Sequence, residues 1–180
     1  MSMELKDCIL TRRSVRKFLD KIVEHEVLEQ VIATAAYAPS WKNTQISRYM
    51  AIEDRAVLET ICKEFLPEHN ANIVSGAPLL IAQTFVKNRC GYERDGSLTT
   101  ARGEGWQYYD CGIAAQTFCL AAHEAGLGTV IMGIFPHKEL GEFLNVPEDQ
   151  ELMALIAVGY PAEQPNAPKR KDVEVLLSYK

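Results

Sequence analysis

Apolar residues recur at helical spacing along several stretches of the chain. Between residues 24 and 38, Val27, Val31 and Ala35 fall on one face of a predicted helix. Pro39 ends that helix, because a proline disfavours helical backbone at the residue before it. The same pattern predicts helices over residues 3–11, 24–38, 55–66, 106–125 and 136–144.

Stretches rich in apolar residues lie between these helices and after the last one. They predict strands over residues 47–53, 78–86, 129–132 and 151–159. Asp54 is a predicted N-cap and Gly126 a predicted C′ residue. Residues 87–105 are polar, charged and glycine-bearing, which predicts a long loop. The chain from Tyr160 onwards contains three prolines and ends in apolar side chains that need a surface to pack against, namely Val173, Val175, Leu176 and Leu177.

The order of these elements indicates the fold class. Two helices precede the first strand, and the helices are longer than the strands, so a strictly alternating doubly wound sheet fits poorly. We expect an α+β sandwich in which helices cover a central sheet on both sides. A length of 180 residues is typical of one domain, so residues 1–180 are predicted to form a single unit.

Composition narrows the functional classes. The hydrophobic fraction of 47% and the charged fraction of 24% are ordinary for a globular protein, and no apolar run is long enough for a membrane span. A formal net charge of −5 argues against nucleic-acid binding. The start of the chain lacks a secretory pattern, and five cysteines without CxxC spacing indicate reduced thiols in the cytoplasm. We expect Cys90 to be exposed in the loop and the other four cysteines to lie in the core.

Common catalytic motifs are absent from the sequence. It contains no P-loop, no GxGxxG after a strand, no GxSxG and no HExxH. The four histidines have no spacing that suggests a metal site, and they are expected on helix surfaces or at caps. We therefore predict no metal and name no catalytic side chain. An enzyme built on this sequence would depend on a bound cofactor for its chemistry.

Three segments suggest what that cofactor is. Residues 11–18, Thr-Arg-Arg-Ser-Val-Arg-Lys-Phe, combine guanidinium and hydroxyl groups that can hold phosphate oxygens. Residues 38–45, Ala-Pro-Ser-Trp-Lys-Asn-Thr-Gln, supply amides, hydroxyls and an indole ring, and residues 169–171 are Lys-Arg-Lys. A phosphate monoester carries nearly two negative charges, so two cationic groups converging on it would offset them. The alternative interpretation of residues 11–18 is a solvated basic turn or an interaction module without cofactor.

In these segments the chain resembles the FMN-dependent nitroreductase family over essentially its whole length. Residues 12–18 resemble the family's opening Arg-Arg/His-Ser-x-Arg/Lys-x-Phe motif, and residues 38–45 resemble its Ala-Pro-Ser-x-x-Asn-x-Gln motif. Further similarities are Gly126-Leu-Gly128 followed by Met132-Gly133, Gly159-Tyr-Pro-Ala162, and Lys169-Arg170. The resemblance implies a three-layer α+β sandwich with a mostly antiparallel central sheet, assembled as a homodimer with a flavin site at the interface.

The resemblance also implies roles for individual residues. Arg12 and Ser14, with Arg13 beside them, would contact the FMN phosphate and ribityl chain, and Lys169 and Arg170 would reach the phosphate from the other end of the chain. Groups near the flavin ring would be Arg16 and Asn70 at the pyrimidine, the backbone of Met132 and Gly133 near N5, and Pro39, Ser40, Trp41 and Asn43 from the partner subunit.

The implied activity is a ping-pong transfer of hydride from NAD(P)H through bound FMN to a small oxidised acceptor such as a nitroaromatic or a quinone. Two alternatives stay open: a non-catalytic protein that stores or senses flavin, and an FMN enzyme of the same fold with other chemistry, such as reductive dehalogenation. Trp41 departs from the small residue common at its place in the family, so it either narrows the pocket or packs in a dimer core. Residues 87–109 align with a region that often shapes the substrate pocket.

Overall fold

A four-stranded antiparallel sheet lies at the centre of the computed structural model, which describes residues 3–180. The strand order is β1-β2-β4-β3, so the two long strands β2 and β4 form the middle. Their bounds are Ser47–Ile52 for β1, Leu79–Val86 for β2, Gly128–Met132 for β3 and Gln150–Gly159 for β4. The expected antiparallel sheet is thereby confirmed.

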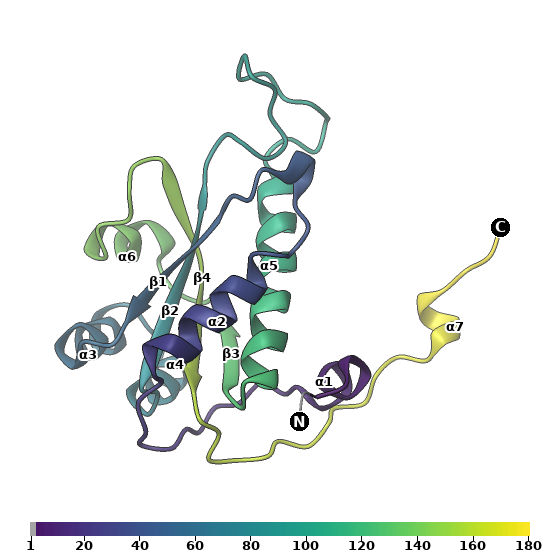
Figure 1. Cartoon of the computed structure of the whole chain (residues 1–180). Helices are drawn as coiled ribbons and strands as arrows, with labels where there is room; N and C mark the ends of the chain where they lie inside the picture. The colour runs from purple at the N-terminus through teal and green to yellow at the C-terminus, as the bar shows by residue number, and fades with distance from the viewer. Residues whose placement is uncertain (1–2) are drawn as a thin grey trace.

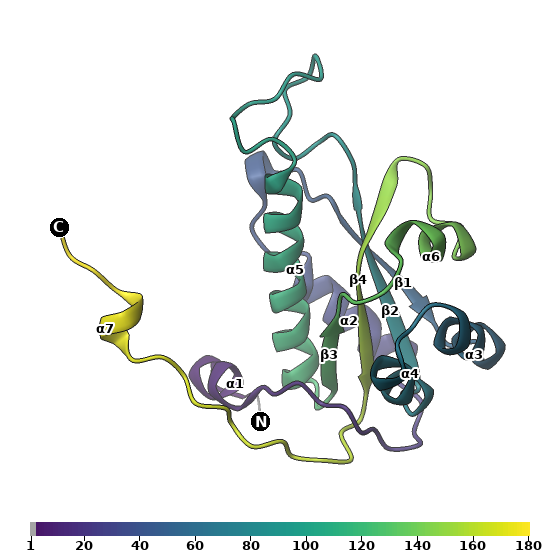
Figure 2. The ribbon, with the colours of Figure 1, turned by 180° about the vertical axis from the view of Figure 1, so that it is seen from behind.

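Helices cover both faces of the sheet and give three layers (Figure 1). On one face lie α2 (His25–Ala35) and the long α5 (Gly105–Glu124), with α1 (Leu5–Thr11) against the end of α5. On the other face lie α3 (Arg55–Glu64), α4 (Glu68–Ser75) and α6 (His137–Phe143). A short α7 (Val173–Leu176) projects from the body on the C-terminal tail, as the reverse view in Figure 2 also shows.

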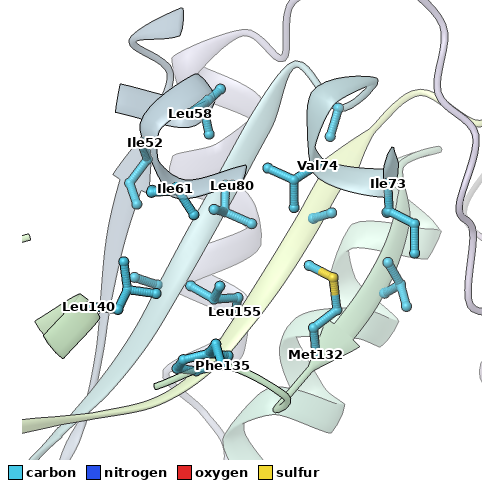
Figure 3. Packing of buried hydrophobic residues seen from close by; sticks show 14 of the residues in the cluster. Ile52, Leu58, Ile61, Ile73, Val74, Leu80, Met132, Phe135, Leu140 and Leu155 are labelled. Carbon is cyan, nitrogen blue, oxygen red and sulfur yellow. The ribbon is translucent and has the colours of Figure 1, made fainter. Parts of the chain in front are cut away.

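Alternation along the central strands divides the core in two. On β2, Leu79 and Ile81 face α2 and α5, whereas Leu80 and Ala82 face the opposite helices. Figure 3 shows Leu80 in the half of the core that lies between the sheet and α3 and α4, surrounded by side chains from these two helices. Both faces of the sheet are therefore buried, which explains why the middle strands are largely apolar rather than alternating between apolar and polar residues.

The predicted helices and strands are confirmed, with boundaries shifted by a few residues at most. Asp54 caps α3 by accepting hydrogen bonds from the N–H groups of Ala56 and Val57. Gly126 has a φ of +82° directly after α5, as the C′ position requires. Residues 87–104 form the predicted long loop, without a helix or strand of their own.

The structure also corrects some expectations. Three elements were not predicted: α4, α7 and the 3-10 turn Trp41–Asn43. The expectation that Cys90 is exposed is wrong, because its side chain is fully buried. Cys62 is half-buried rather than in the core, while Cys8, Cys111 and Cys119 are buried as expected. Between residues 3 and 180, no helix combines the length and apolar character needed to cross a membrane.

Candidate functional site

The arginine segment, residues 12–18, lies between the start of β3 and the chain that follows β4. The N–H of Val15 donates to the carbonyl of Thr129 at 3.0 Å, and Ser14 pairs with Thr129 as an isolated bridge. On the other side, the N–H of Ala162 donates to the carbonyl of Lys17 at 2.9 Å. The fold therefore brings residues 12–18 beside the Gly126-Leu-Gly128 and Gly159-Tyr-Pro-Ala162 motifs, although more than a hundred residues separate them in sequence.

Two glycines make this close approach possible. A Cβ atom on Gly128 would lie 2.8 Å from the side chain of Val15, and one on Gly159 would lie 2.6 Å from the ring of Pro78. Gly128 and Gly159 are paired across β3 and β4. Gly128 thus allows β3 to approach the side chain of Val15, and Gly159, where a Cβ atom would also lie 3.0 Å from Phe18, allows β4 to approach Pro78 and Phe18.

The three arginines of the segment have different surroundings. Arg13 donates from Nη1 to the carbonyl oxygens of Leu10 at 2.7 Å and of Arg12 at 2.8 Å, so it caps the end of α1. The exposed Arg16 donates from Nη1 to the carbonyl of Ser14 at 3.2 Å. Within residues 3–180, none of the segment's guanidinium groups forms an ion pair with a carboxylate. The carboxylate of Glu163 accepts the backbone N–H of Arg16 at 2.8 Å instead.

A pocket of about 470 Å³ opens beside this segment. Its lining includes Thr11, Arg13, His123, Gly128 and Glu163. The hydroxyl of Thr11 lies 2.8 Å from Nε2 of His123, and it also donates to the carbonyl of Asp7 at 2.7 Å. Burial, together with the charges of Arg12 and Arg13, holds the pKa of His123 below its usual value. This corner therefore gathers the positive charges of Arg12 and Arg13 near His123, together with the carboxylate of Glu163, which accepts the backbone N–H of Arg16 at 2.8 Å.

The far end of β3 brings together a second group of the predicted residues. Met132 is buried, Gly133 follows it at the surface, and Asn70 projects from α4 toward the same loop. The side-chain amide of Asn70 lies 3.5 Å from the carbonyl of Ile134. The side chain of Ile134 is itself exposed and leaves an apolar surface beside Gly133. Polar groups and an apolar wall thus meet at this end of the strand.

A third group, the Pro39 segment (residues 38–45), lies at the N-terminal end of α5. The N–H of Trp41 donates to the carboxylate of Asp110, at 2.9 Å to Oδ2 and 3.2 Å to Oδ1. The rings of Trp41 and Trp106 are 4.5 Å apart between centroids. A pocket of about 370 Å³ adjoins the segment and is lined in part by Ser40 and Tyr49. Pro39 and Asn43 are exposed.

Within one chain these groups do not all meet. Asp110 and His123 mark the two ends of α5, and 13 residues of helix correspond to roughly 20 Å. The Pro39 segment at one end is therefore far from the arginine segment at the other. Lys169 and Arg170 are exposed on the tail, and no hydrogen bond or ion pair connects them to the arginine segment in the part of the chain that the structure describes.

Sequence reasoning missed two residues of this region. The sequence analysis assigns no role to Asp110, but this residue falls on the same stripe of α5 as the buried Ala114 and Phe118, a spacing that could have revealed its burial. His123 was expected at a helix surface or cap. It does lie in the last turn of α5, but it is half-buried and bonded to Thr11.

Comparison with known proteins decides the family. The sequence matches the model of the Nitroreductase family over residues 9–160. The chain belongs to the nitroreductase family. A curated relative of Methanothermobacter thermautotrophicus, provisionally named NADH dehydrogenase/NAD(P)H nitroreductase, is 32% identical over 169 residues, which cover 91% of this chain and 80% of the relative.

The chain is also similar to a protein named for another activity and to a protein solved with FMN. The iodotyrosine deiodinase of Haliscomenobacter hydrossis is 29% identical over 193 residues, covering 92% of this chain and 84% of that protein. A protein of Desulfovibrio desulfuricans, provisionally a nitroreductase and solved in complex with FMN, matches with a TM-score of 0.76 and 25% identity, covering 100% of this chain and 99% of that one. The expected nitroreductase fold is confirmed.

Proposed function

We propose that this member of the nitroreductase family is an FMN-dependent oxidoreductase that takes hydride from NAD(P)H and reduces a small oxidised acceptor by a ping-pong reaction. The observation that carries this proposal is the cluster of arginines beside the start of β3. There the guanidinium groups of the arginine segment are free of carboxylate partners within the described residues. The FMN-bound relative from Desulfovibrio desulfuricans supports the choice of anion.

The residues present fit a flavin mononucleotide. Arg12 and Ser14 would hold the phosphate and ribityl chain, with Arg13 contributing charge while its guanidinium caps α1. At the other end of β3, Asn70 and the backbone at Gly133 offer hydrogen bonds, and Ile134 offers apolar contact. Polar groups at one end of a strand and a partly apolar surface at the other match a ligand with an anionic tail and an aromatic ring.

A second copy of the chain completes the proposed site. The Pro39 segment and the arginine segment lie roughly 20 Å apart along α5, so one chain cannot place both against one small ligand. Apolar side chains are also left exposed on α1 and α7, among them Leu5, Val175 and Leu176. Exposed apolar surface of this kind favours association. We infer a homodimer in which Pro39, Ser40, Trp41 and Asn43 contact the flavin held by the partner, and in which the tail brings Lys169 and Arg170 to a phosphate.

FMN, when bound, supplies the hydride and electron chemistry that the protein's own side chains lack. The chain's own residues would bind the flavin, orient it and tune its electrostatic surroundings. Arg16 would place a fixed positive charge near the pyrimidine edge, where negative charge develops on reduction. Met132 and Gly133 would shape the surface on which donor and acceptor alternate. No side chain is assigned as a general acid, and the five free thiols fit a cytoplasmic location.

The decisive experiment uses the purified full-length protein loaded with FMN under anaerobic conditions. Addition of NADH or NADPH should bleach the visible absorbance of the flavin, and a nitroaromatic or quinone should then restore it. Failure of both nucleotides to bleach a protein that does contain FMN would contradict the reductase and favour a flavin-storing or flavin-sensing role. A protein that takes up no FMN would contradict the cofactor assignment itself.

Reductive dehalogenation is the second candidate, because an iodotyrosine deiodinase is among the relatives at 29% identity. The two activities differ in the acceptor. Chemically reduced holoprotein mixed with iodotyrosine should release no iodide if the first proposal is correct, while a quinone should be reduced at once. Iodide release in step with flavin reoxidation would mean that the acceptor is a halogenated phenol and not a nitroaromatic or a quinone.

A further inference from the structure

Asp110 is a buried carboxylate that the proposed function leaves without a role. Only 4% of the residue is exposed, and it is the one charged residue among the buried polar residues that the structure describes. No cation forms an ion pair with it within residues 3–180. Burying a carboxylate without a cationic partner is costly unless several hydrogen bonds satisfy it. The donors that face Asp110 therefore indicate what it does.

Those donors come from two segments that are distant in sequence. One is the N–H of Trp41, which bonds both carboxylate oxygens. The other is the thiol of Cys90, whose Sγ donates to Oδ2 at 3.0 Å. Burial, with Asp110 next to it, raises the pKa of Cys90 to about 12, so the thiol keeps its proton and stays a donor. The carboxylate thus connects α5 to the Pro39 segment and to the loop 87–104.

The Pro39 segment needs such a fixed point because its backbone is strained. Lys42, Asn43 and Gln45 have φ values of 44°, 55° and 48°, in the left-handed region that non-glycine residues seldom occupy. Backbone of this kind persists where surrounding contacts hold it, and it is found at functional sites. The bond from the N–H of Trp41 to Asp110 lies directly before the strained residues. A second bond, from the N–H of Gln45 to Oγ of Ser40 at 3.0 Å, closes the turn.

We propose that Asp110 is a positioning residue for the flavin: its buried carboxylate, by accepting the N–H of Trp41, fixes the strained Pro39 segment in the conformation that contacts the ring. This inference rests on the proposed function, since it assumes that the segment meets FMN. It adds a residue of α5 that lines the pocket beside the Pro39 segment and would act on the flavin through Trp41. The thiol of Cys90, a weak donor, contributes less to the arrangement than the amide of Trp41 does.

The test compares Asp110→Ala with Asp110→Asn in the full-length protein. Asparagine keeps an acceptor oxygen for the N–H of Trp41, whereas alanine removes it. We expect Asp110→Ala to raise the dissociation constant of FMN about tenfold, which corresponds to about 1.4 kcal/mol. It should also alter the visible circular dichroism of the bound flavin. In Asp110→Asn the dissociation constant should stay within about threefold of the native value, and the spectrum should be close to the native one.

Gln107→Met is the matched control. Gln107 is buried one turn earlier on α5 and accepts the N–H of Asn88 at 2.7 Å, so it connects the same helix to the loop 87–104, and within residues 3–180 its side chain forms no hydrogen bond with the Pro39 segment. This variant should lose thermal stability and keep the native flavin spectrum. Native FMN affinity in Asp110→Ala would overturn the proposal, as would an equal loss in Gln107→Met.

Hydrogen exchange at the amide of Trp41 separates this inference from the proposed function. Exchange in the flavin-free protein should be faster in Asp110→Ala than in Gln107→Met. If wild-type protein takes up no FMN, the proposed function fails, and the exchange rate alone decides whether Asp110 holds the segment. Equal exchange at Trp41 in the two variants would show that it does not.

Discussion

Two regions of this chain are expected to meet the same ligand, yet they differ in how they obtain their structure. The Pro39 segment is held inside its own chain by Asp110, by Ser40 and by the packing of Trp41 on Trp106. The C-terminal tail, residues 162–180, exposes both its cations and its apolar side chains, and only the four-residue α7 is regular. In Figure 1 the tail leads away from the body.

The difference indicates at which stage each region loses its conformational entropy. A segment fixed during folding is preorganised and costs little when the ligand arrives. In the proposed homodimer, a tail whose apolar residues have nothing to cover in its own chain would become ordered on the partner, so its contribution would depend on dimerisation. One half of the proposed site is therefore a property of the monomer, and the other half is a property of the assembly.

The largest expected effect comes from removing the tail. Deleting residues 167–180 takes away Lys169 and Arg170, and each charge-assisted hydrogen bond to a phosphate contributes about 1.5–3 kcal/mol. We expect FMN binding to weaken at least about a hundredfold, since about 1.4 kcal/mol is a factor of ten. Flavin fluorescence titration measures the affinity, and sedimentation should show dissociation into monomers. An unchanged dissociation constant would mean that the tail takes no part in the site.

Arginine substitutions give the next effect and test the other end of the phosphate site. Arg12→Ala should weaken FMN retention by roughly 1.5–3 kcal/mol, the range for a charged hydrogen bond. Arg13→Ala is its control, because the Nη1 atom of Arg13 is already bonded to the carbonyls of Leu10 and Arg12. That variant should lower thermal stability through α1 and affect FMN less. Equal losses of affinity in the two variants would contradict the distinction between them.

The elements of the fold were largely predictable because their signals are local. The amphipathic spacing of α2 and α3 and the caps at Asp54 and Gly126 are each contained within a few residues, and all were confirmed. α4 was missed because polar residues such as Asn72 interrupt its pattern. Its helical conformation is stabilised instead by the packing of Ile73 and Val74 against the sheet, which no local signal reports.

The candidate site was predictable in composition but not in arrangement. Motifs revealed the arginines and the Pro39 segment, whereas their separation along α5 follows from tertiary structure alone. The error at Cys90 has the same origin. Its loop closes tightly, because a Cβ atom on Gly91, whose φ is +83°, would lie 2.5 Å from the carbonyl of Gly103. This closure buries the thiol of Cys90, although the polar sequence around it predicted exposure.

A smaller effect distinguishes the buried hydrogen bond between Trp41 and Asp110 from an exposed ion pair of the same Pro39 segment. Nζ of Lys42 lies 2.8 Å from Oε1 of Glu93, with about half of each side chain accessible to solvent. Exposed ion pairs are weak and screened by salt, so Lys42→Ala should change FMN affinity by less than about twofold. An effect as large as that of Asp110→Ala would show that the exposed ion pair, and not the buried carboxylate, holds the segment.

The Lys42–Glu93 pair also makes a pH prediction. The hydrogen bond from Lys42 lowers the pKa of Glu93 in the folded protein. A lowered carboxyl pKa gives a stabilisation that is present above the unfolded pKa and is lost as the pH falls through the folded one. Lys42→Ala should therefore weaken the acid sensitivity of unfolding, as measured by thermal melts over a series of acidic pH values.

The smallest effect concerns two histidines with opposite shifts. The pKa of His123 is lowered by burial and by Arg12 and Arg13, so between its folded and unfolded pKa values the unfolded chain binds more protons. His123 therefore reduces stability as the pH falls through that window. His25 is the control, because its hydrogen bond to Glu53 raises its pKa and gives a stabilisation that is lost as the pH rises. In thermal melts, the His123→Gln protein should lose less stability on acidification than wild type. The His25→Gln protein should lose more.

FMN links this last measurement to the phosphate site. A bound phosphate would offset the charges of Arg12 and Arg13 beside His123, which would raise the histidine pKa toward its usual value. The pH dependence of stability contributed by His123 should therefore be smaller in the FMN-loaded protein than in the flavin-free protein, while that of His25, which faces Glu53 elsewhere, should not change. An identical His123 contribution with and without FMN would place the phosphate away from the arginine segment, and the charge argument for the site would then fail.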